Sequence, residues 1–262
     1  KAVDLSGISL IPLGTASPFN PDEPSTCYWL QIRDHGHFLI DCGFLTWQCF
    51  EANGGDLTQL RGLIITHGHG DHIDLTAYMN RSCKLEIWTT IEIYEMAKRI
   101  TCAKANISKE EFVNHFAYVQ IDASYPDKKG NIKGASKFID DLELRFHYSI
   151  HSIPTIGMNL WKEGKKLVAF SSDMCDFDTM YKLKEKGVIS ETRVNLIKQR
   201  MSNEGHNDCW ILLDCGGDGL IHGKIEGYLP YYQEKDKIVM CHRERRLPGE
   251  KLLARLSEPL SV

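Results

Sequence analysis

Residues 66–72 read Thr-His-Gly-His-Gly-Asp-His, and they come directly after the apolar run Leu63-Ile64-Ile65. An apolar run followed by a polar, glycine-containing segment predicts a buried strand that ends in a loop. In an extended chain, side chains two positions apart lie on the same side, so His67 and His69 can reach one metal ion. The glycines at positions 68 and 70 remove side chains between the histidines and permit backbone angles that other residues resist.

Asp71 and His72 add a carboxylate and a third imidazole at a point where the chain can turn into a helix. Four such groups would crowd a single ion, whereas two adjacent ions would use all of them. The alternatives are a solvated histidine-rich loop and an Asp that caps the start of a helix. The order and spacing of the residues favour a metal site over both.

The segment resembles the His-x-His-x-Asp-His signature of the metallo-β-lactamase superfamily. This resemblance implies a two-metal hydrolase of the α/β class, built as a four-layer αββα sandwich. The turn from Gly14 to Pro18 is similar to the opening turn of the tRNase Z and phosphodiesterase-like branch. Residue spacing without the resemblance indicates only a metal site.

Asp41 ends the second strand of a predicted hairpin that pairs residues 27–32 with 37–40. The Asp41-Cys42-Gly43 sequence at this point is also found in the superfamily. There the Asp lies beneath the metals and supports their ligands, which is one interpretation of Asp41. A plain turn residue is the other.

Three further candidate ligands stand at the ends of predicted strands over residues 142–150, 165–170 and 237–241, namely His151, Asp173 and His242. His147 competes with His151, but it lies earlier on its strand. The resemblance implies that His151 and His242 are metal ligands and that Asp173 bridges two cations. The Ser-Gly pair that usually precedes this Asp in the family is Ser171-Ser172 here.

The resemblance also implies how the ligands divide between the two ions. The first metal would be held by His67, His69 and His151, the second by Asp71, His72 and His242, with Asp173 between them. A hydroxide bound between the cations would be the nucleophile, and Asp71 would orient it or accept its proton. Zinc is the first expectation from the imidazole-rich donors, which also suit manganese or iron.

His222 and Lys224 are the candidates for acting on a substrate. The segment Ile221-His222-Gly223-Lys224 resembles the His-Ser-Thr loop of tRNase Z-like phosphodiesterases, in which the histidine stabilises the attacked phosphate or protonates the leaving oxygen. Lys224 would add positive charge toward an anion, and an ordinary loop histidine is the alternative for His222. The His-Glu-Ala-Thr segment of tRNase Z is missing, and Asp214-Cys215-Gly216-Gly217 lies nearby instead.

These features predict a dinuclear phosphodiesterase that acts on a nucleotide or nucleic-acid phosphodiester, either an RNA end or a cyclic nucleotide. The alternatives are a lactonase-like or thioesterase-like acyl hydrolase, a diiron redox protein and a non-catalytic metal-binding module. Acyl hydrolases of this fold lack an equivalent of His222, and diiron relatives usually replace the histidine at position 69 with Glu. Degenerate relatives lose ligands, whereas this chain keeps the full set.

Composition sets the remaining expectations. The 262 residues predict one domain of two halves, with a seam near residues 125–135. A net charge of −4 argues against broad nonspecific affinity for nucleic acid, and no apolar run predicts a membrane span. The nine cysteines include no Cys-x-x-Cys pair, which predicts reduced thiols in a cytoplasmic protein. The sequence leaves a homodimer open.

Overall fold

The computed structural model describes residues 7–20, 23–79, 84–217, 221–232, 235–243 and 260–261. The chain divides into two compact units, Lys1–Ile121 with Leu256–Ser261 and Asp122–Arg255 with Val262. This boundary lies just before the seam predicted near residues 125–135, and the assignment of the chain to one domain stays a prediction. No described helix is long and apolar enough to cross a membrane.

The first unit is built on a seven-stranded sheet with the order β15-β1-β2-β3-β4-β5-β6. Its strands are β1 (Ile8–Gly14), β2 (Cys27–Ile32), β3 (Gly36–Ile40), β4 (Leu60–Ile64), β5 (Leu85–Thr89), β6 (Phe116–Gln120) and β15 (Leu260–Ser261). Strands β1 to β3 form an antiparallel meander, and β3 to β6 run parallel to one another. The strands predicted at 27–32 and 37–40 are therefore confirmed as a hairpin.

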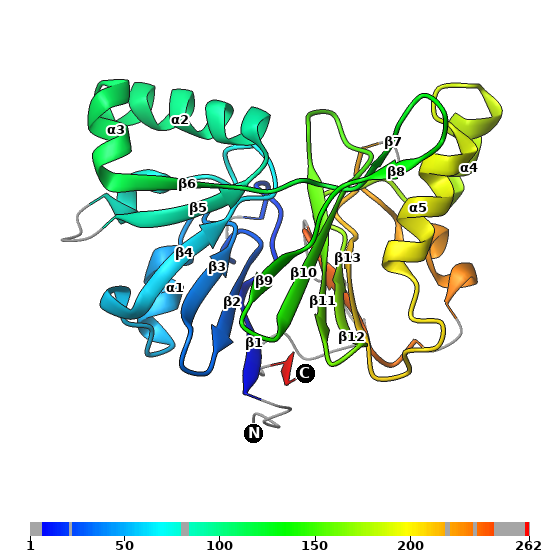
Figure 1. Ribbon diagram of the computed structural model, residues 1–262, viewed down its shortest axis with the longest axis horizontal. Helices are drawn as coiled ribbons and strands as arrows, with labels where there is room; N and C mark the ends of the chain where they lie inside the picture. Colours follow the sequence, from blue (N-terminus) through cyan, green and yellow to red (C-terminus); the bar gives the residue numbers. More distant parts are fainter. Residues whose placement is uncertain are drawn as a thin grey trace. The chain divides into compact units, whose positions relative to one another are not determined.

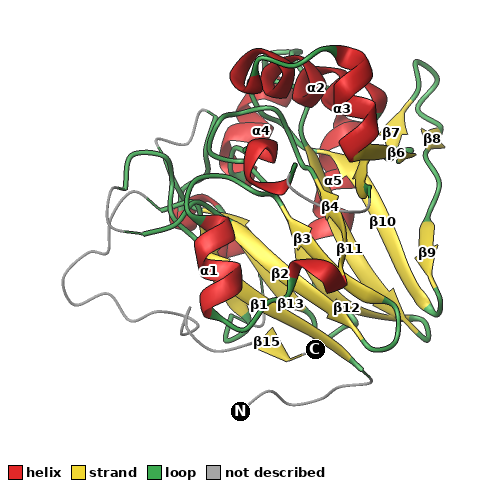
Figure 2. Ribbon diagram, turned by 90° about the vertical axis from the view of Figure 1, so that its left-hand side faces the viewer, coloured by secondary structure: helices red, strands yellow, loops and turns green. Residues whose placement is uncertain are grey.

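Three helices accompany this sheet, α1 (Thr46–Ala52), α2 (Ile91–Ala105) and α3 (Lys109–His115). Helix α2 ends because Asn106 takes a left-handed conformation, and α3 begins at once with a capping box between Ser108 and Glu111. Both helices lie beside β5 and β6 (Figures 1 and 2). Short 3₁₀ helices at Leu57–Gln59 and Leu75–Tyr78 complete the connections.

The second unit is built on a six-stranded sheet with the order β14-β13-β12-β11-β10-β9 and a separate β7-β8 pair. Its strands are β7 (Tyr125–Pro126), β8 (Ile132–Lys133), β9 (Lys137–Ile139), β10 (Leu142–Tyr148), β11 (Ile156–Lys162), β12 (Lys165–Phe170), β13 (Trp210–Asp214) and β14 (Ile238–Cys241). Helices α4 (Phe177–Glu185) and α5 (Glu191–Met201) lie next to each other, and α5 packs on β10, β11 and β12 (Figure 1). The 3₁₀ helices Ile225–Gly227 and Leu229–Tyr231 precede β14.

Strand direction brings the candidate residues of each unit to one edge of its sheet. In the first unit β3 and β4 are parallel, so the segments after Ile40 and Ile64 leave the sheet on the same side. In the second unit β12, β13 and β14 are parallel, and β10 shares their direction because β10 and β12 are both antiparallel to β11. The segments that follow these strands carry His151, Asp173 and His242.

His147 is buried inside the second sheet and is not one of the clustered metal-binding groups. It pairs across the strands with Gly157, where an added Cβ would come within 2.6 Å of the His147 ring. Neither ring nitrogen has a hydrogen-bond partner among the described residues. Burial, with a further contribution from the positive charges of Arg200 and Lys166, lowers the pKa of His147 to about 3.

A His147→Leu substitution should make the stability of the protein less sensitive to acid. Unfolding frees His147 to bind a proton below pH 6.5 while the folded state keeps it neutral down to about pH 3, so stability is lost as the pH falls through that window. At pH 5 this loss is about 2 kcal/mol relative to pH 7. Urea unfolding at both pH values measures it, and a His115→Leu control should keep the wild-type difference. If the free energy of unfolding changed equally between pH 7 and pH 5 in His147→Leu and in wild type, His147 would not be the source of the acid sensitivity.

Candidate active site

The first unit holds two pairs of donors in the loop after β4. His67 Nε2 lies 3.2 Å from His69 Nδ1, and Asp71 Oδ2 lies 3.2 Å from His72 Nε2. Two donors about 2.1 Å from one tetrahedral ion lie about 3.4 Å apart, so each pair has the separation expected of two ligands on one metal. The rings of His67 and His72 lie 4.0 Å apart, which makes the two pairs neighbours.

A single buried carboxylate orients two of these imidazoles. Asp41 Oδ2 accepts hydrogen bonds from His72 Nδ1 at 2.7 Å and from the Thr66 hydroxyl at 2.8 Å, and Asp41 Oδ1 accepts the Thr66 amide. Because the Thr66 hydroxyl donates to Asp41, it is free to accept from His67 Nδ1, which lies 3.0 Å away. Both imidazoles then present Nε2 as an electron-pair donor, the tautomer that a metal requires.

Backbone hydrogen bonds hold the segment after Asp41 against the segment that contains His72. Cys42 donates its amide to the His72 carbonyl, and Asp74 donates its amide to the Cys42 carbonyl. Burial raises the pKa of Asp41, whereas the hydrogen bonds from His72 and Thr66 act in the opposite direction. Thr66 has a part in this geometry that its sequence context did not reveal.

The two glycines between the histidines differ in how closely they are packed, and the structure does not bear out the unusual backbone angles predicted for them. Neither Gly68 nor Gly70 has a positive φ. A Cβ at Gly68 would lie 1.9 Å from the Met96 sulfur of α2, while a Cβ at Gly70 would meet nothing within 4 Å. Gly43 is the tightest position, since its Cβ would lie 1.5 Å from the Asp71 carbonyl. Gly43 is therefore needed for close approach of the backbone, whereas the contact at Gly68 is with the flexible side chain of Met96.

In the second unit the Asp173 carboxylate lies between two candidate ligands. Its Oδ2 is 3.8 Å from His151 Nε2 and 3.4 Å from His242 Nε2, and all three side chains are buried. His151 is held by a contact of 2.8 Å between its Nδ1 and the Ile221 carbonyl, so Nδ1 donates and Nε2 is left to accept. An oxygen placed between two imidazoles suits a ligand that serves two cations.

Asp214 is a second buried carboxylate that orients a histidine, and the sequence did not single it out. Its Oδ2 accepts hydrogen bonds from the Met174 amide and from His222 Nδ1, both at 2.8 Å, and its Oδ1 accepts the Gly216 amide. These bonds leave His222 Nε2 as the ring nitrogen that can reach a substrate. Asp214 closes an apolar strand, and that position was its only signal in the sequence.

The loop after β13 is shaped around two histidines. A Cβ at Gly216 would lie 2.0 Å from the His242 carbonyl, and one at Gly217 would lie 2.4 Å from the His222 Cβ. The glycines at positions 216 and 217 thus permit close packing of this loop against both histidines. Lys224 is exposed, and its amide donates to Asp176 Oδ2 at 3.1 Å. Its role toward an anion stays a prediction.

Three positions at or beside the candidate ligands have strained backbone conformations. Asp41, Ser172 and His242 have φ values of 62°, 52° and 57°, the left-handed region that side chains with a Cβ rarely adopt. Ser172 stands where the resemblance implies a Gly, and its conformation is the reason a Gly is suitable there. The Ser172 hydroxyl has no hydrogen-bond partner among the described residues, so the side chain does not offset its strain.

The donor types of both units fit divalent metal ions. Asp173, Asp214, His222 and His242 offer ligand atoms that lie within 4.8 Å of one another. The Asp214 oxygens already accept hydrogen bonds from two amides and from His222, so we regard Asp173 and His242 as the ligands of this group. Imidazole and carboxylate donors suit zinc, manganese and iron alike.

Comparisons with known proteins identify relatives of this arrangement. A family model described as anti-Pycsar protein Apyc1 matches residues 8–243. Over 190 residues, or 72% of this chain, the sequence is 25% identical to the cGMP-dependent 3′,5′-cGMP phosphodiesterase A of Dictyostelium discoideum. The match spans only 20% of the length of that relative.

Solved structures share the fold at lower sequence identity. Human tRNase Z, short form, has a TM-score of 0.66 at 17% identity, with 97% of this chain and 98% of that chain covered. The metallo-β-lactamase fold protein YhfI from Bacillus subtilis has a TM-score of 0.59 at 15% identity, with 90% and 86% covered. A diphosphatase of the PhnP family has a TM-score of 0.64 at 13% identity, with 97% and 96% covered. The predicted α/β metallo-β-lactamase fold is thus confirmed.

A Ser172→Gly substitution should stabilise the protein and leave its metal content unchanged. Removal of the left-handed strain gains about 1–2 kcal/mol, and the added flexibility of the unfolded chain costs about 0.5–1 kcal/mol. The net gain of up to about 1.5 kcal/mol is measured by urea unfolding. Ser171→Gly is the matched control, because it removes the Ser171 hydroxyl that bonds the Ser172 carbonyl and the Asp214 amide. Stability should fall in that control, and a fall in Ser172→Gly as well would contradict the strain argument.

Proposed function

Because the chain belongs to the anti-Pycsar protein Apyc1 family, we propose that it is a metal-dependent phosphodiesterase whose substrate is a cyclic nucleotide. The phosphodiesterase-like character of that family and the match to a cGMP phosphodiesterase support this class of substrate. The observation that carries the proposal is the pair of donor sets after β4, in which each set has the separation of two ligands on one metal.

We propose two metal ions, with zinc as the first expectation. His67, His69 and His151 would hold one ion, and Asp71, His72 and His242 would hold the other, with Asp173 serving both. When bound, such ions supply an activated water at neutral pH and neutralise charge on the phosphate. Asp71 has a side chain only 9% exposed and would orient the water in addition to holding its metal. Lys224 would add positive charge near the substrate.

His222 would supply the proton that the reaction needs at the leaving oxygen. Opening a cyclic phosphodiester breaks a P–O bond to an alkoxide, which is a poor leaving group until it is protonated. The contact of 2.8 Å with Asp214 stabilises a positively charged His222, whose Nε2 can then donate a proton. Asp214 acts through His222, so it is a positioning residue.

The first experiment tests substrate class and metal dependence together. Purified protein should contain two metal equivalents by elemental analysis and should convert 3′,5′-cyclic nucleotides to nucleoside monophosphates, with activity lost after chelation and regained with zinc or manganese. Asp173→Ala should lose metal and activity. Hydrolysis of a lactone or thioester, or trimming of a precursor tRNA, without turnover of any cyclic nucleotide would overturn the proposal.

The second experiment separates proton donation from metal binding. His222→Ala should keep both metals and lower kcat on a cyclic nucleotide on the order of a hundredfold, the usual scale for a positioned acid. Much of this loss should vanish on bis(p-nitrophenyl) phosphate, whose leaving group needs no proton.

Asp214→Asn should show the same dependence on the leaving group with a smaller loss. The alkaline limb of its pH–rate profile should lie at lower pH than in wild type, because His222 holds its proton less tightly without the carboxylate. The control is Asp208→Asn, which removes an exposed carboxylate paired with Lys237 and should leave the kinetics unchanged. If Asp214→Asn loses metal and loses activity equally on both substrates, Asp214 is a ligand rather than a positioning residue.

A further inference from the structure

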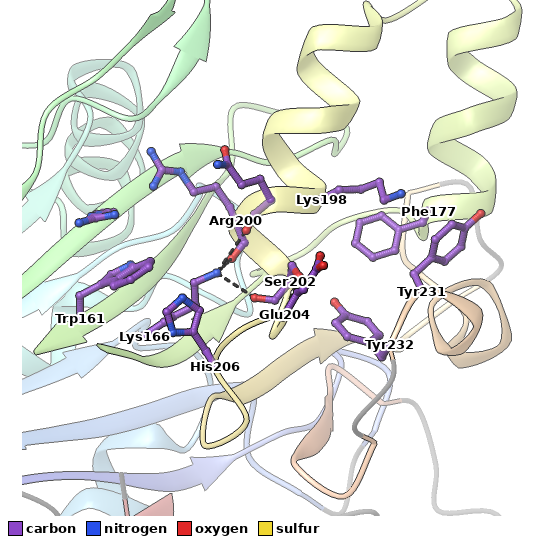
Figure 3. Close-up of a pocket in the computed structure, with 12 residues that line it drawn as sticks. Trp161, Lys166, Phe177, Lys198, Arg200, Ser202, Glu204, His206, Tyr231 and Tyr232 are labelled. Atoms are coloured by element: carbon purple, nitrogen blue, oxygen red, sulfur yellow. Dashed lines mark hydrogen bonds between the residues drawn. The ribbon is translucent and has the colours of Figure 1, made fainter. Parts of the chain in front are cut away.

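The second unit contains a cavity of about 500 Å³ that the proposed reaction does not use (Figure 3). Its walls come from the β11-β12 hairpin, the C-terminal part of α5 and the loops after α5 and before β14. This volume lies in the range of sites for small ligands and cofactors.

Four cations line the cavity, and most of their charge is not matched by carboxylates. Arg145 pairs with Glu143, whereas within the described chain Lys166, Lys198 and Arg200 form no ion pair. Lys166 is 5% exposed and donates to the carbonyls of Gln199, Arg200 and Ser202 at the end of α5. Burial, together with the charges of Arg200 and Arg145, lowers the pKa of Lys166 to about 8. Such crowding of like charges is relieved by a bound anion.

Aromatic rings stand among these cations. The Arg145 guanidinium lies 4.1 Å from the centre of the Trp161 ring, and the Lys198 amine lies 5.0 Å from that of Tyr231. Phe177 and Tyr232 complete the aromatic wall beside Tyr231 (Figure 3). Flat apolar faces next to positive charge are the combination with which proteins bind nucleotides, because the base stacks and the phosphate pairs.

Three hydrogen-bond donors in the wall are not used within the described residues. Trp161 Nε1, Arg200 Nε and the Tyr232 hydroxyl are buried and have no partner there. Buried donors without a partner are uncommon in folded proteins, and these three belong to residues that line the cavity.

One side of the cavity, at Trp161 and Lys166, lies at the far end of two strands from the candidate ligands, whereas Phe177 on its other side follows Asp173 by four residues. Trp161 and Lys166 are cross-strand partners next to the β11-β12 turn, whereas Asp173 follows the other end of β12. The four residue steps from Lys166 to Phe170 span roughly 13 Å of strand. None of the candidate ligands lines the cavity, and neither does His222 or Lys224, so the inference does not rest on the proposed function.

We propose that this cavity binds a mononucleotide, with the phosphate among the cations and the base against the aromatic wall. Glu204, an exposed acid at the cavity, opposes the phosphate and limits the affinity.

Isothermal titration of the metal-loaded protein tests this proposal with 5′-GMP, guanosine and inorganic phosphate as separate probes. Wild type should bind 5′-GMP more tightly than either fragment, at a site that remains when His222 is replaced by Ala. The double variant Lys198→Gln/Arg200→Gln should lose roughly tenfold or more of this affinity, and Glu204→Gln should gain affinity. Turnover and metal content of these variants should stay at wild-type values.

The matched control is Lys237→Gln, because Lys237 also lies over a tryptophan, 5.9 Å from the Trp210 ring, but outside the cavity. It should bind 5′-GMP as wild type does. Unchanged affinity in the double variant would overturn the proposal, and equal affinity for phosphate and 5′-GMP would overturn the role of the aromatic wall. Loss of hydrolysis alone bears only on the proposed function.

Discussion

The buried carboxylate of Asp41 is the constraint on which the histidine loop depends. It accepts hydrogen bonds from His72 and from the amide and hydroxyl of Thr66, and the Thr66 hydroxyl passes the orientation on to His67. One negative charge in the interior thereby sets the tautomers of two imidazoles. The cost of burying that charge is offset by three hydrogen bonds to it. Without Asp41 the rings would be free to rotate, and the donors would lose their alignment.

In the second unit a buried carboxylate, that of Asp214, likewise orients an imidazole. Asp214 ends β13 as Asp41 follows β3. Asp214 accepts hydrogen bonds from two backbone amides and one imidazole, whereas Asp41 accepts one amide, one hydroxyl and one imidazole. Strand ends are suitable for this role because the sheet holds the backbone rigid up to the last paired residue. The carboxylate then lies where the loops of neighbouring parallel strands emerge. In each unit, hydrogen bonds to a buried carboxylate thus orient the candidate side chains at one edge of the sheet.

Backbone strain occurs near the oriented side chains of both units. Asp41, Ser172 and His242 have left-handed conformations, and close packing at Gly43 and Gly216 leaves the neighbouring loops no room to relax. Conformations of this kind persist only where the surrounding structure determines them, and they gather at functional sites. The strained conformations at Ser172 and His242 lie at the candidate site, where a fixed geometry is kept at a cost in local stability.

The sequence by itself indicated the main strands and a metal site after residue 65, because apolar runs and strand-end polar residues are local signals. The fold class and the full ligand set followed from the resemblance of residues 66–72 to the metallo-β-lactamase signature. The sequence also favoured His151 over His147, which the structure buries within its sheet. The bonds from Thr66 to Asp41 and from His222 to Asp214 join residues 25 and eight positions apart, and the cavity brings Arg145 together with Tyr232. Only the tertiary structure decides such contacts, because they depend on which strands lie side by side and how closely the loops pack.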